Sequence, residues 1–183
     1  ARDVDGVVLG PVSHNAYPPV ADGGLNPSGV LRKTLDLYAN IRPARTFDGY
    51  PSPCGKAFDL VIFRENTEGF YADRNMASGT GEIWPDADMV LALRKITRMA
   101  SARIAEAAFA RAATREARHV TAVHKANVLR ESDGLFLQEV RRAAESYPDV
   151  TYDESLVDAM AALLVRQPEA YDVVVTTNMF GDI

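Results

Sequence analysis

The most informative segment of the chain reads Leu60-Val61-Ile62-Phe63-Arg64-Glu65-Asn66-Thr67-Glu68-Gly69-Phe70-Tyr71. Its first four residues are apolar, which indicates a short buried strand of the kind found in parallel sheets. An arginine, two carboxylates, a glycine and a tyrosine follow where that strand ends. Burial of a strand requires no such group of charges, and ligands of open α/β sheets bind at the carboxyl ends of strands. We therefore expect residues 64–71 to form part of a functional site.

On both sides of this segment, apolar runs alternate with amphipathic stretches. The expected strands are residues 4–9, 41–47, 60–63, 120–123, 150–152 and 171–176. The expected helices are residues 27–38, 86–113, 133–147 and 155–166, and residues 71–81 are expected to be irregular. Asn26 and Pro27 suit the N-cap and the first position of the first helix. Strands that alternate with helices predict an α/β fold with much parallel pairing.

The composition is that of a globular chain. With 183 residues and 47% hydrophobic content it can bury a core, as one domain or as parts of two. Cys54 is the single cysteine, so no intrachain disulfide can form, and a reducing compartment is expected. No apolar run approaches the ~20 residues of a membrane span, and no signal peptide is visible. These features predict a cytoplasmic protein without membrane partners.

Basic residues recur between Arg94 and Arg118, but acidic residues interrupt them, and the formal net charge of the chain is −5. A nucleic-acid-binding surface usually carries a basic surplus. The pattern therefore favours a solvated helix face and predicts no nucleic-acid partner.

Arg32, Arg42 and Arg64 each lie near the edge of an expected element. A guanidinium group matches a carboxylate with two parallel hydrogen bonds, so three that converge would bind a substrate with two or more carboxylates. The alternative is that Arg32 is a solvated helix residue and that Arg42 belongs to a surface ion pair. Spacing alone favours this alternative.

Lys125 follows the strand expected at residues 120–123. A lysine that is desolvated at a strand exit has a lowered pKa and can act as a base near neutral pH. The alternative, which the position alone favours, is an ordinary exposed lysine.

Asp158 and Asp182 are candidate ligands for a hard cation such as Mg²⁺, which prefers carboxylate oxygens. Asp158 also fits the third position of a helix capping box that starts at Ser155. Asp182 follows Gly181 at a strand exit, where a free acid is harder to explain structurally. A complete metal site would need at least one more acid.

Five segments taken together resemble the isocitrate/isopropylmalate dehydrogenase family, the metal-dependent β-decarboxylating dehydrogenases. They are residues 31–43 (LRKTLDLYANIRP), 64–71 (RENTEGFY), 124–129 (HKANVL), 157–158 (VD) and 178–183 (NMFGDI), and they occur in the family's order. This ordered set outweighs the structural alternatives given above for the individual residues. The resemblance implies an isocitrate/isopropylmalate dehydrogenase-like fold, with α/β/α layers around a mixed sheet.

The same resemblance implies an NAD- or NADP-dependent oxidative decarboxylation of a 2-hydroxy acid with Mg²⁺ or Mn²⁺. Arg32, Arg42 and Arg64 would hold the substrate carboxylates, and Asp158 and Asp182 would bind the metal. Lys125 would help to remove the hydroxyl proton while hydride passes to the nicotinamide. After CO₂ leaves, Tyr71 would protonate the enol carbon as general acid.

Members of this family have a split nucleotide-binding domain and a contiguous central domain with the dimer contacts. By analogy, residues 1–37 belong to the nucleotide-binding domain and residues 38–183 to the central substrate, metal and dimerisation domain. A homodimer is implied, in which Lys125 and Asp158 reach into the neighbouring subunit's site. The chain opens and closes beside apolar runs, so we expect it to be a piece of a longer protein that carries the adenosine-binding segment elsewhere.

Residues just before Arg32 meet the β-carbon substituent of the substrate in this family. Residues 26–30 (NPSGV), with Ser28 among them, contain no leucine cluster that would pack an isopropyl group. We therefore favour isocitrate, homoisocitrate, tartrate or malate over 3-isopropylmalate. A non-catalytic paralogue or regulatory subunit that keeps the dimer fold is the alternative, and the presence of Tyr71 and Lys125 beside both aspartates favours catalysis.

Overall fold

A computed structural model describes residues 2–11, 13, 16–19, 22–71 and 81–183 of the protein. The chain divides into two compact units, Ala1–Leu37 and Tyr38–Ile183. The expected assignment of the first unit to a nucleotide-binding domain stays a prediction.

The first unit contains helix α1 (Pro27–Thr34). Its start is as predicted: Asn26 is the N-cap, and its side chain accepts a hydrogen bond of 3.1 Å from the Gly29 N–H. The helix ends at Thr34 instead of residue 38, and Asp36 takes a positive φ of 46° just beyond it. The strand predicted at residues 4–9 is wrong, because these residues pair with no strand and their apolar side chains are exposed.

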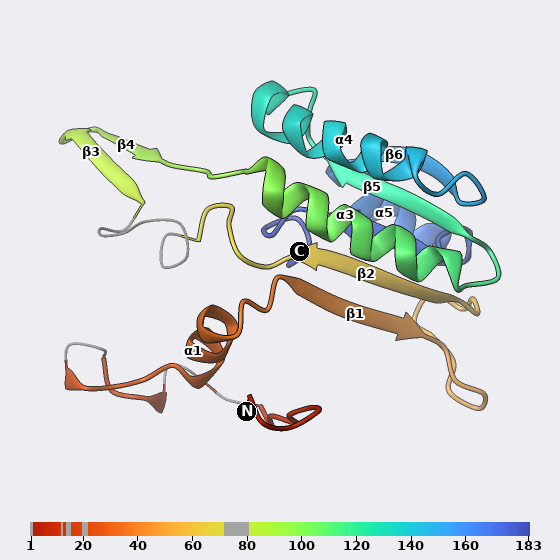
Figure 1. Ribbon diagram of the computed structural model, residues 1–183, viewed down its shortest axis with the longest axis horizontal. Helices are drawn as coiled ribbons and strands as arrows, with labels where there is room; N and C mark the ends of the chain where they lie inside the picture. Colours follow the sequence, from red (N-terminus) through yellow and green to blue (C-terminus); the bar gives the residue numbers. More distant parts are fainter. Residues whose placement is uncertain (1, 12, 14–15, 20–21, 72–80) are drawn as a thin grey trace. The chain divides into compact units, whose positions relative to one another are not determined.

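A mixed sheet is the centre of the second unit. Its strands are β1 (Ala39–Arg45), β2 (Asp59–Glu65), β5 (His119–His124), β6 (Thr151–Leu156) and β7 (Val173–Thr176). They lie in the order β1-β2-β7-β5-β6 (Figure 1). Strand β1 is antiparallel to β2, and the remaining pairs are parallel. Pro43 lies in β1 at the sheet edge, where its missing N–H costs no ladder bond.

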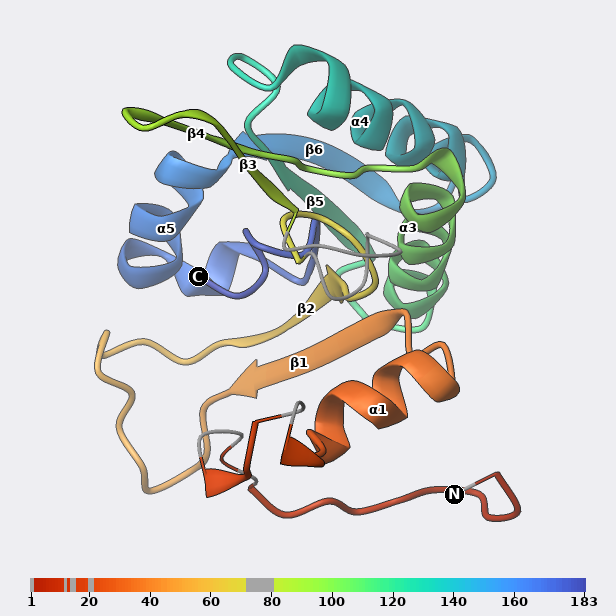
Figure 2. The same ribbon diagram turned by 90° about the vertical axis from the view of Figure 1, so that its left-hand side faces the viewer.

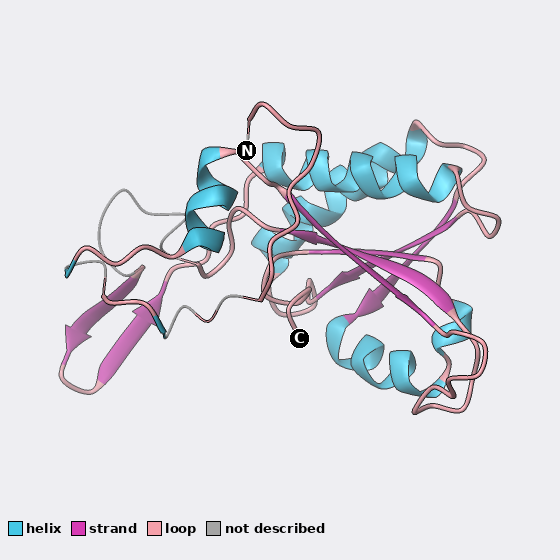
Figure 3. Ribbon diagram, turned by 90° about the horizontal axis from the view of Figure 1, so that it is seen from below, coloured by secondary structure: helices cyan, strands magenta, loops and turns pink. Residues whose placement is uncertain are grey.

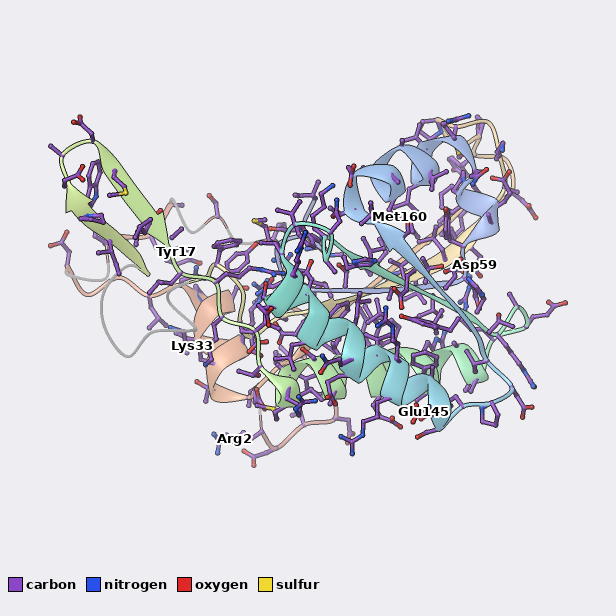
Figure 4. The ribbon with its side chains drawn as sticks, turned by 90° about the horizontal axis from the view of Figure 1, so that it is seen from above. Arg2, Tyr17, Lys33, Asp59, Glu145 and Met160 are labelled. Atoms are coloured by element: carbon purple, nitrogen blue, oxygen red, sulfur yellow. The ribbon has the colours of Figure 1, made fainter. Side chains whose placement is uncertain are left out.

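Helices cover both faces of this sheet. Helices α3 (Arg98–Ala113) and α4 (Arg130–Glu145) pack side by side on one face (Figure 2). Helix α5 (Val157–Arg166) covers the other face, so the unit has α/β/α layers as predicted (Figure 3). Met160, labelled in Figure 4, packs from α5 against Val123 and Val174. The larger core lies under α3 and α4, where Ile104, Phe109 and Phe136 are fully buried.

The helix predicted for residues 86–113 is wrong over its first part. Strands β3 (Glu82–Asp86) and β4 (Met89–Ala92) form a separate two-stranded hairpin instead. The Asp86 side chain accepts a hydrogen bond of 2.8 Å from the Asp88 N–H, which fixes the turn between the strands. Helix α3 begins only at Arg98, where Thr97 caps it by accepting from the Ala100 N–H. Met89 and Leu93 are four residues apart, a spacing that also fits one face of a helix.

The boundaries of the remaining elements shift by a few residues. Helix α4 begins at Arg130, before the expected start at Asp133, and a short 3₁₀ helix covers Pro168–Ala170. The capping box proposed at Ser155 is wrong: Ser155 belongs to β6, and α5 starts at Val157 without a side-chain cap. Within the described residues, no helix is long and apolar enough to cross a membrane. Residues 72–80 of the segment expected to be irregular lie outside the described residues.

Candidate active site

The candidate site lies at the carboxyl ends of the parallel strands of the second unit. Segments 66–71, 125–129 and 177–183 leave β2, β5 and β7 there. Because parallel strands end at the same edge of a sheet, residues distant in sequence come together at this edge. Four of the predicted site residues lie in or directly beside these segments: Arg64, Tyr71, Lys125 and Asp182.

Arg64 is the centre of the first cluster, and its side chain is only 4% exposed. Its Nε donates to Asn178 Oδ1 at 2.8 Å, and its Nη1 forms an ion pair with Asp182. Its Nη2 donates to the Tyr71 hydroxyl at 3.1 Å. Each of the three guanidinium nitrogens therefore contacts a residue of the candidate site.

Asp182 is the shared acceptor of this cluster. Besides the ion pair with Arg64, it accepts from Arg42 Nη2 at 3.2 Å and from the Tyr71 hydroxyl at 3.1 Å. Burial raises the pKa of Asp182, but the charge of Arg64 and the hydrogen bonds of Arg42, Tyr71 and Arg64 outweigh burial and hold the pKa below its usual range. The structure thus brings together Arg42, Arg64, Tyr71 and Asp182.

Gly181 allows this close approach. A Cβ added at Gly181 would lie 2.7 Å from the Arg64 Cβ and 3.0 Å from the Thr176 side chain. Its own carbonyl accepts from Arg42 Nη1 at 3.2 Å. The position therefore requires a residue without a side chain.

Lys125 and Asp158 form the second cluster. Lys125 Nζ donates to Asp158 Oδ1 at 2.5 Å, and this hydrogen bond lowers the pKa of the Asp158 carboxyl. Lys125 follows β5 directly, and Asp158 lies in the first turn of α5. The capping box that was the structural alternative for Asp158 is not formed, because α5 starts without a side-chain cap.

The two aspartates suit a divalent metal by their chemistry. The Asp182 side chain is 49% exposed and the Asp158 side chain is 65% exposed, so their oxygens can be reached from solvent. Carboxylate oxygens are the ligands that Mg²⁺ and Mn²⁺ prefer. Within the part of the chain that the structure describes, no three His, Cys, Asp or Glu side chains gather as a metal site. Asp158 and Asp182 thus each supply one suitable carboxylate, but they do not form a complete metal site.

Ser28 and Arg32 lie on α1 in the first unit. They are four residues apart, which places them on one face of the helix. Their expected role in substrate binding stays a prediction.

Sequence reasoning missed buried polar residues of this edge. Asn178 is 1% exposed; it accepts from Arg64, and its Nδ2 donates to the Glu68 carbonyl at 2.7 Å. Arg94, which was counted with a solvated helix face, has a side chain that is only 7% exposed and pairs with the fully buried Asp133. Asn178 could have been noticed because it follows a β-branched strand, whereas the Arg94–Asp133 pair has no local signal.

Comparisons with known proteins identify the family. The family model described as isocitrate/isopropylmalate dehydrogenase matches residues 1–183. The chain is 44% identical over 165 residues to the human mitochondrial NAD isocitrate dehydrogenase subunit alpha, covering 90% of this chain and 43% of that protein. It is 40% identical to the chloroplastic 3-isopropylmalate dehydrogenase of Solanum tuberosum, and this match covers 90% of this chain and 44% of that protein.

A solved structure gives the same result for the fold. The crystal structure of isocitrate dehydrogenase from Methylococcus capsulatus superposes with a TM-score of 0.74 at 42% sequence identity. The match covers 90% of this chain and 48% of that chain. The chain spans less than half the length of the relatives it matches.

Proposed function

The chain belongs to the isocitrate/isopropylmalate dehydrogenase family, and on that basis we propose that the protein catalyses NAD- or NADP-dependent oxidative decarboxylation of a 2-hydroxy acid. The observation that carries the proposal is the convergence of Arg42, Arg64 and Tyr71 on Asp182. Two guanidinium groups, a phenol and an acid at one sheet edge are the groups that binding and protonating a polycarboxylate would need.

Arg42 and Arg64 would hold carboxylates of the substrate. Both already direct guanidinium nitrogens at a carboxylate, that of Asp182. Guanidinium groups match carboxylates with paired hydrogen bonds, which suits an anionic substrate. Arg32, with Ser28 on the same helix face, would complete the binding of the substrate.

Lys125 would take the proton of the substrate hydroxyl, and Tyr71 would return a proton to the enol carbon after CO₂ has left. The position of Tyr71 supports this role. Its hydroxyl accepts from Arg64 Nη2, and the Arg64 guanidinium lies 5.6 Å from the centroid of its ring. A neighbouring guanidinium stabilises the phenolate that remains after the proton has been given.

Asp158 and Asp182 would hold Mg²⁺ or Mn²⁺, which when bound supplies Lewis-acid polarisation of substrate oxygens. NAD⁺ or NADP⁺ would accept the hydride from C2. The remaining steps belong to side chains of the protein: carboxylates are bound by arginines, and protons are moved at Lys125 Nζ and at the Tyr71 hydroxyl.

The substrate we favour is isocitrate, homoisocitrate, tartrate or malate. Ser28 and its neighbours on α1 offer no leucine cluster for an isopropyl group. The relatives include both an isocitrate and a 3-isopropylmalate dehydrogenase, so the family by itself does not decide between these substrates. A cytoplasmic location also remains a proposal.

We propose a homodimer in which Lys125 and Asp158 serve the neighbouring subunit's site. The hairpin β3–β4 supports this assembly. A two-stranded hairpin alone is marginally stable in water, yet this one leaves Trp84 67%, Ile83 49% and Leu91 48% exposed. Apolar side chains gathered on such an element mark an interaction surface. A second copy of the chain is the partner that the oligomeric family suggests.

The test is a steady-state assay of the full-length protein against a panel of 2-hydroxy acids with each nicotinamide cofactor. We expect NADH or NADPH formation that EDTA abolishes and Mn²⁺ restores. The variant Tyr71→Phe should lose at least about 100-fold in kcat, because general acid catalysis typically contributes that much.

Arg45→Met is the matched control for Arg42→Met, because both variants remove an arginine from the edge strand β1. Arg45 lies at the end of β1 that is opposite to the site, where it contacts Phe47. Arg45→Met should leave kcat unchanged, whereas Arg42→Met should raise the KM for the acid. No reduced cofactor with any acid would instead support a non-catalytic or regulatory subunit.

A further inference from the structure

Arg94 lies between β4 and α3 and contacts residues from several segments. Its Nη1 donates to Ser132 Oγ at 2.7 Å and to Asp133 Oδ1 at 2.6 Å. Its Nη2 donates to Thr177 Oγ1 at 3.1 Å. One guanidinium fork therefore ties the start of α4 to the segment that follows β7.

Aromatic rings complete the surroundings of this guanidinium. Its central carbon lies 5.9 Å from the centroid of the Phe70 ring and 5.4 Å from that of Phe180. Phe70 precedes Tyr71, and Phe180 lies in the turn between Asn178 and Asp182. Arg94 is thus held by cation–π contacts to the segments that leave β2 and β7.

Asp133 extends the network to the third strand exit. It is fully buried, and its Oδ2 accepts a hydrogen bond of 2.5 Å from the backbone N–H of Lys125. The carboxylate that pairs with Arg94 therefore also fixes the peptide that carries Lys125. Arg94 and Asp133 together contact all three segments of the candidate site.

A buried ion pair is weak grounds for stability, because desolvation of both charges offsets much of their attraction. We propose that Arg94, through Asp133, is a positioning residue that fixes the Lys125 backbone and the 177–182 turn relative to one another. The proposal rests on the proposed function for its kinetic consequence, but not for its structural one. Arginine is needed because a lysine cannot bond Asp133 and Thr177 with a rigid fork.

The experiment compares Arg94→Met and Arg94→Lys with the control Arg98→Met in the full-length protein. Arg98 also pairs with a buried acid, Glu139, which is 2% exposed, but this acid lies in α4 and not in a strand-exit segment. All three variants remove or alter an arginine that faces a buried carboxylate. Only the Arg94 variants should disturb the site.

We expect Arg94→Met to lower kcat about 100-fold, the loss that a small misplacement of catalytic groups can cause. The KM of the hydroxy acid should stay near its wild-type value, because Arg94 itself is not among the carboxylate-binding arginines. Arg94→Lys should give an intermediate kcat, and Arg98→Met a wild-type kcat. Should Arg94→Met not fold, Arg94→Lys decides the comparison.

Amide hydrogen exchange followed by mass spectrometry gives a readout that does not depend on turnover. Exchange should accelerate in the peptides that contain Lys125 and residues 177–182 in the Arg94 variants, and not in Arg98→Met. Equal kcat losses in Arg94→Met and Arg98→Met would overturn the proposal. Unchanged exchange in those peptides in the Arg94 variants would overturn it as well. If the wild-type protein turns over no hydroxy acid, the proposed function fails, while the exchange comparison still decides the positioning role.

Discussion

At the scale of single residues, the candidate site depends on how closely Gly181 and Arg64 approach. The Arg64 guanidinium bonds Asn178, Asp182 and Tyr71 at once, so its side chain has no alternative rotamer that keeps these partners. Gly181 lies directly beside the stem of that side chain. The backbone of the turn and the arginine therefore have to move together if either is changed.

Gly181→Ala tests this dependence. The added Cβ would lie 2.7 Å from the Arg64 Cβ, which forces the turn or the arginine to shift. We expect a loss of about 1–3 kcal/mol in the free energy of unfolding, as for overpacking in a close-packed region, and a raised KM for the anionic substrate. Urea denaturation and steady-state kinetics measure the two effects.

Gly134→Ala is the matched control for this substitution. Gly134 lies inside α4 with nothing within 4 Å of an added Cβ. The same change should stabilise the helix there by roughly 0.5–1 kcal/mol, because alanine is the better helix former. If both variants shift the free energy of unfolding in the same direction, the steric account of Gly181 is wrong.

At the scale of elements, the end of β5 shows how a strand exit is shaped. His124 Nδ1 accepts a hydrogen bond of 3.0 Å from the Ala126 N–H, so the neutral ring carries its proton on Nε2. Burial lowers the pKa of His124, opposed by the charges of Glu154 and Asp133 and assisted by Arg141. The bond to Ala126 also requires the neutral ring, because imidazolium has no acceptor.

This histidine should make the stability of the protein depend on pH. The folded pKa is lower than the unfolded value of about 6.5, so at pH values between the two the folded state binds fewer protons than the unfolded state. The contribution of His124 to the free energy of unfolding is therefore fully present above about pH 6.5. It is lost as the pH falls through the folded pKa. His124→Asn keeps an acceptor for Ala126 without a titrating group. Urea denaturation at about pH 5 and pH 7.5 should show a smaller loss for the variant, and parallel pH profiles would contradict this assignment.

The sequence predicts the elements whose signals are local. Strand β5 and its exit were predicted because Val120, Ala122 and Val123 are apolar and a histidine and a lysine follow. The helix expected from residue 86 was wrong because the spacing of Met89 and Leu93 fits a helix, while the turn at Asp86 and the cap at Thr97 decide the structure.

The residues of the candidate site likewise differ in whether a local sequence signal marks them. Arg64 and Tyr71 could be singled out because they stand together in one segment after an apolar strand. Arg94 and Asp133 could not, because their burial results from the packing of α4 against the segments after β2 and β7. The sequence shows which residues are charged, but it does not show which residue each of them pairs with across the sheet edge.

At the scale of the whole molecule, the proposed chemistry is divided between two clusters. Arg64, Tyr71 and Asp182 form one, and Lys125 and Asp158 form the other. Among the residues that the structure describes, neither cluster contains three metal ligands. In a site assembled from two copies, Asp158 of one copy would join Asp182 of the other, and the exposed hairpin β3–β4 offers a surface for such a pair.

Mixed dimers test whether Tyr71 and Lys125 act across the subunit boundary. The variants Tyr71→Phe and Lys125→Met should each be inactive, and co-expression with two affinity tags yields dimers with one subunit of each kind. If the residues come from different subunits, each mixed dimer has one intact site and one site with both defects. Purified mixed dimers should then show about one half of the wild-type kcat, and the unfractionated mixture of equal amounts about one quarter, because about half of its dimers are mixed.

Wild-type protein mixed with the double variant Tyr71→Phe/Lys125→Met gives the control. Mixed dimers of this pair have no intact site if the residues are shared across subunits, since each site then contains one defect. The activity should fall to about one quarter of the wild-type value, against about one half if each subunit carries a complete site. Verified mixed dimers of the single variants that remain inactive would place Tyr71 and Lys125 in the same subunit's site, and the shared-site dimer would then be wrong.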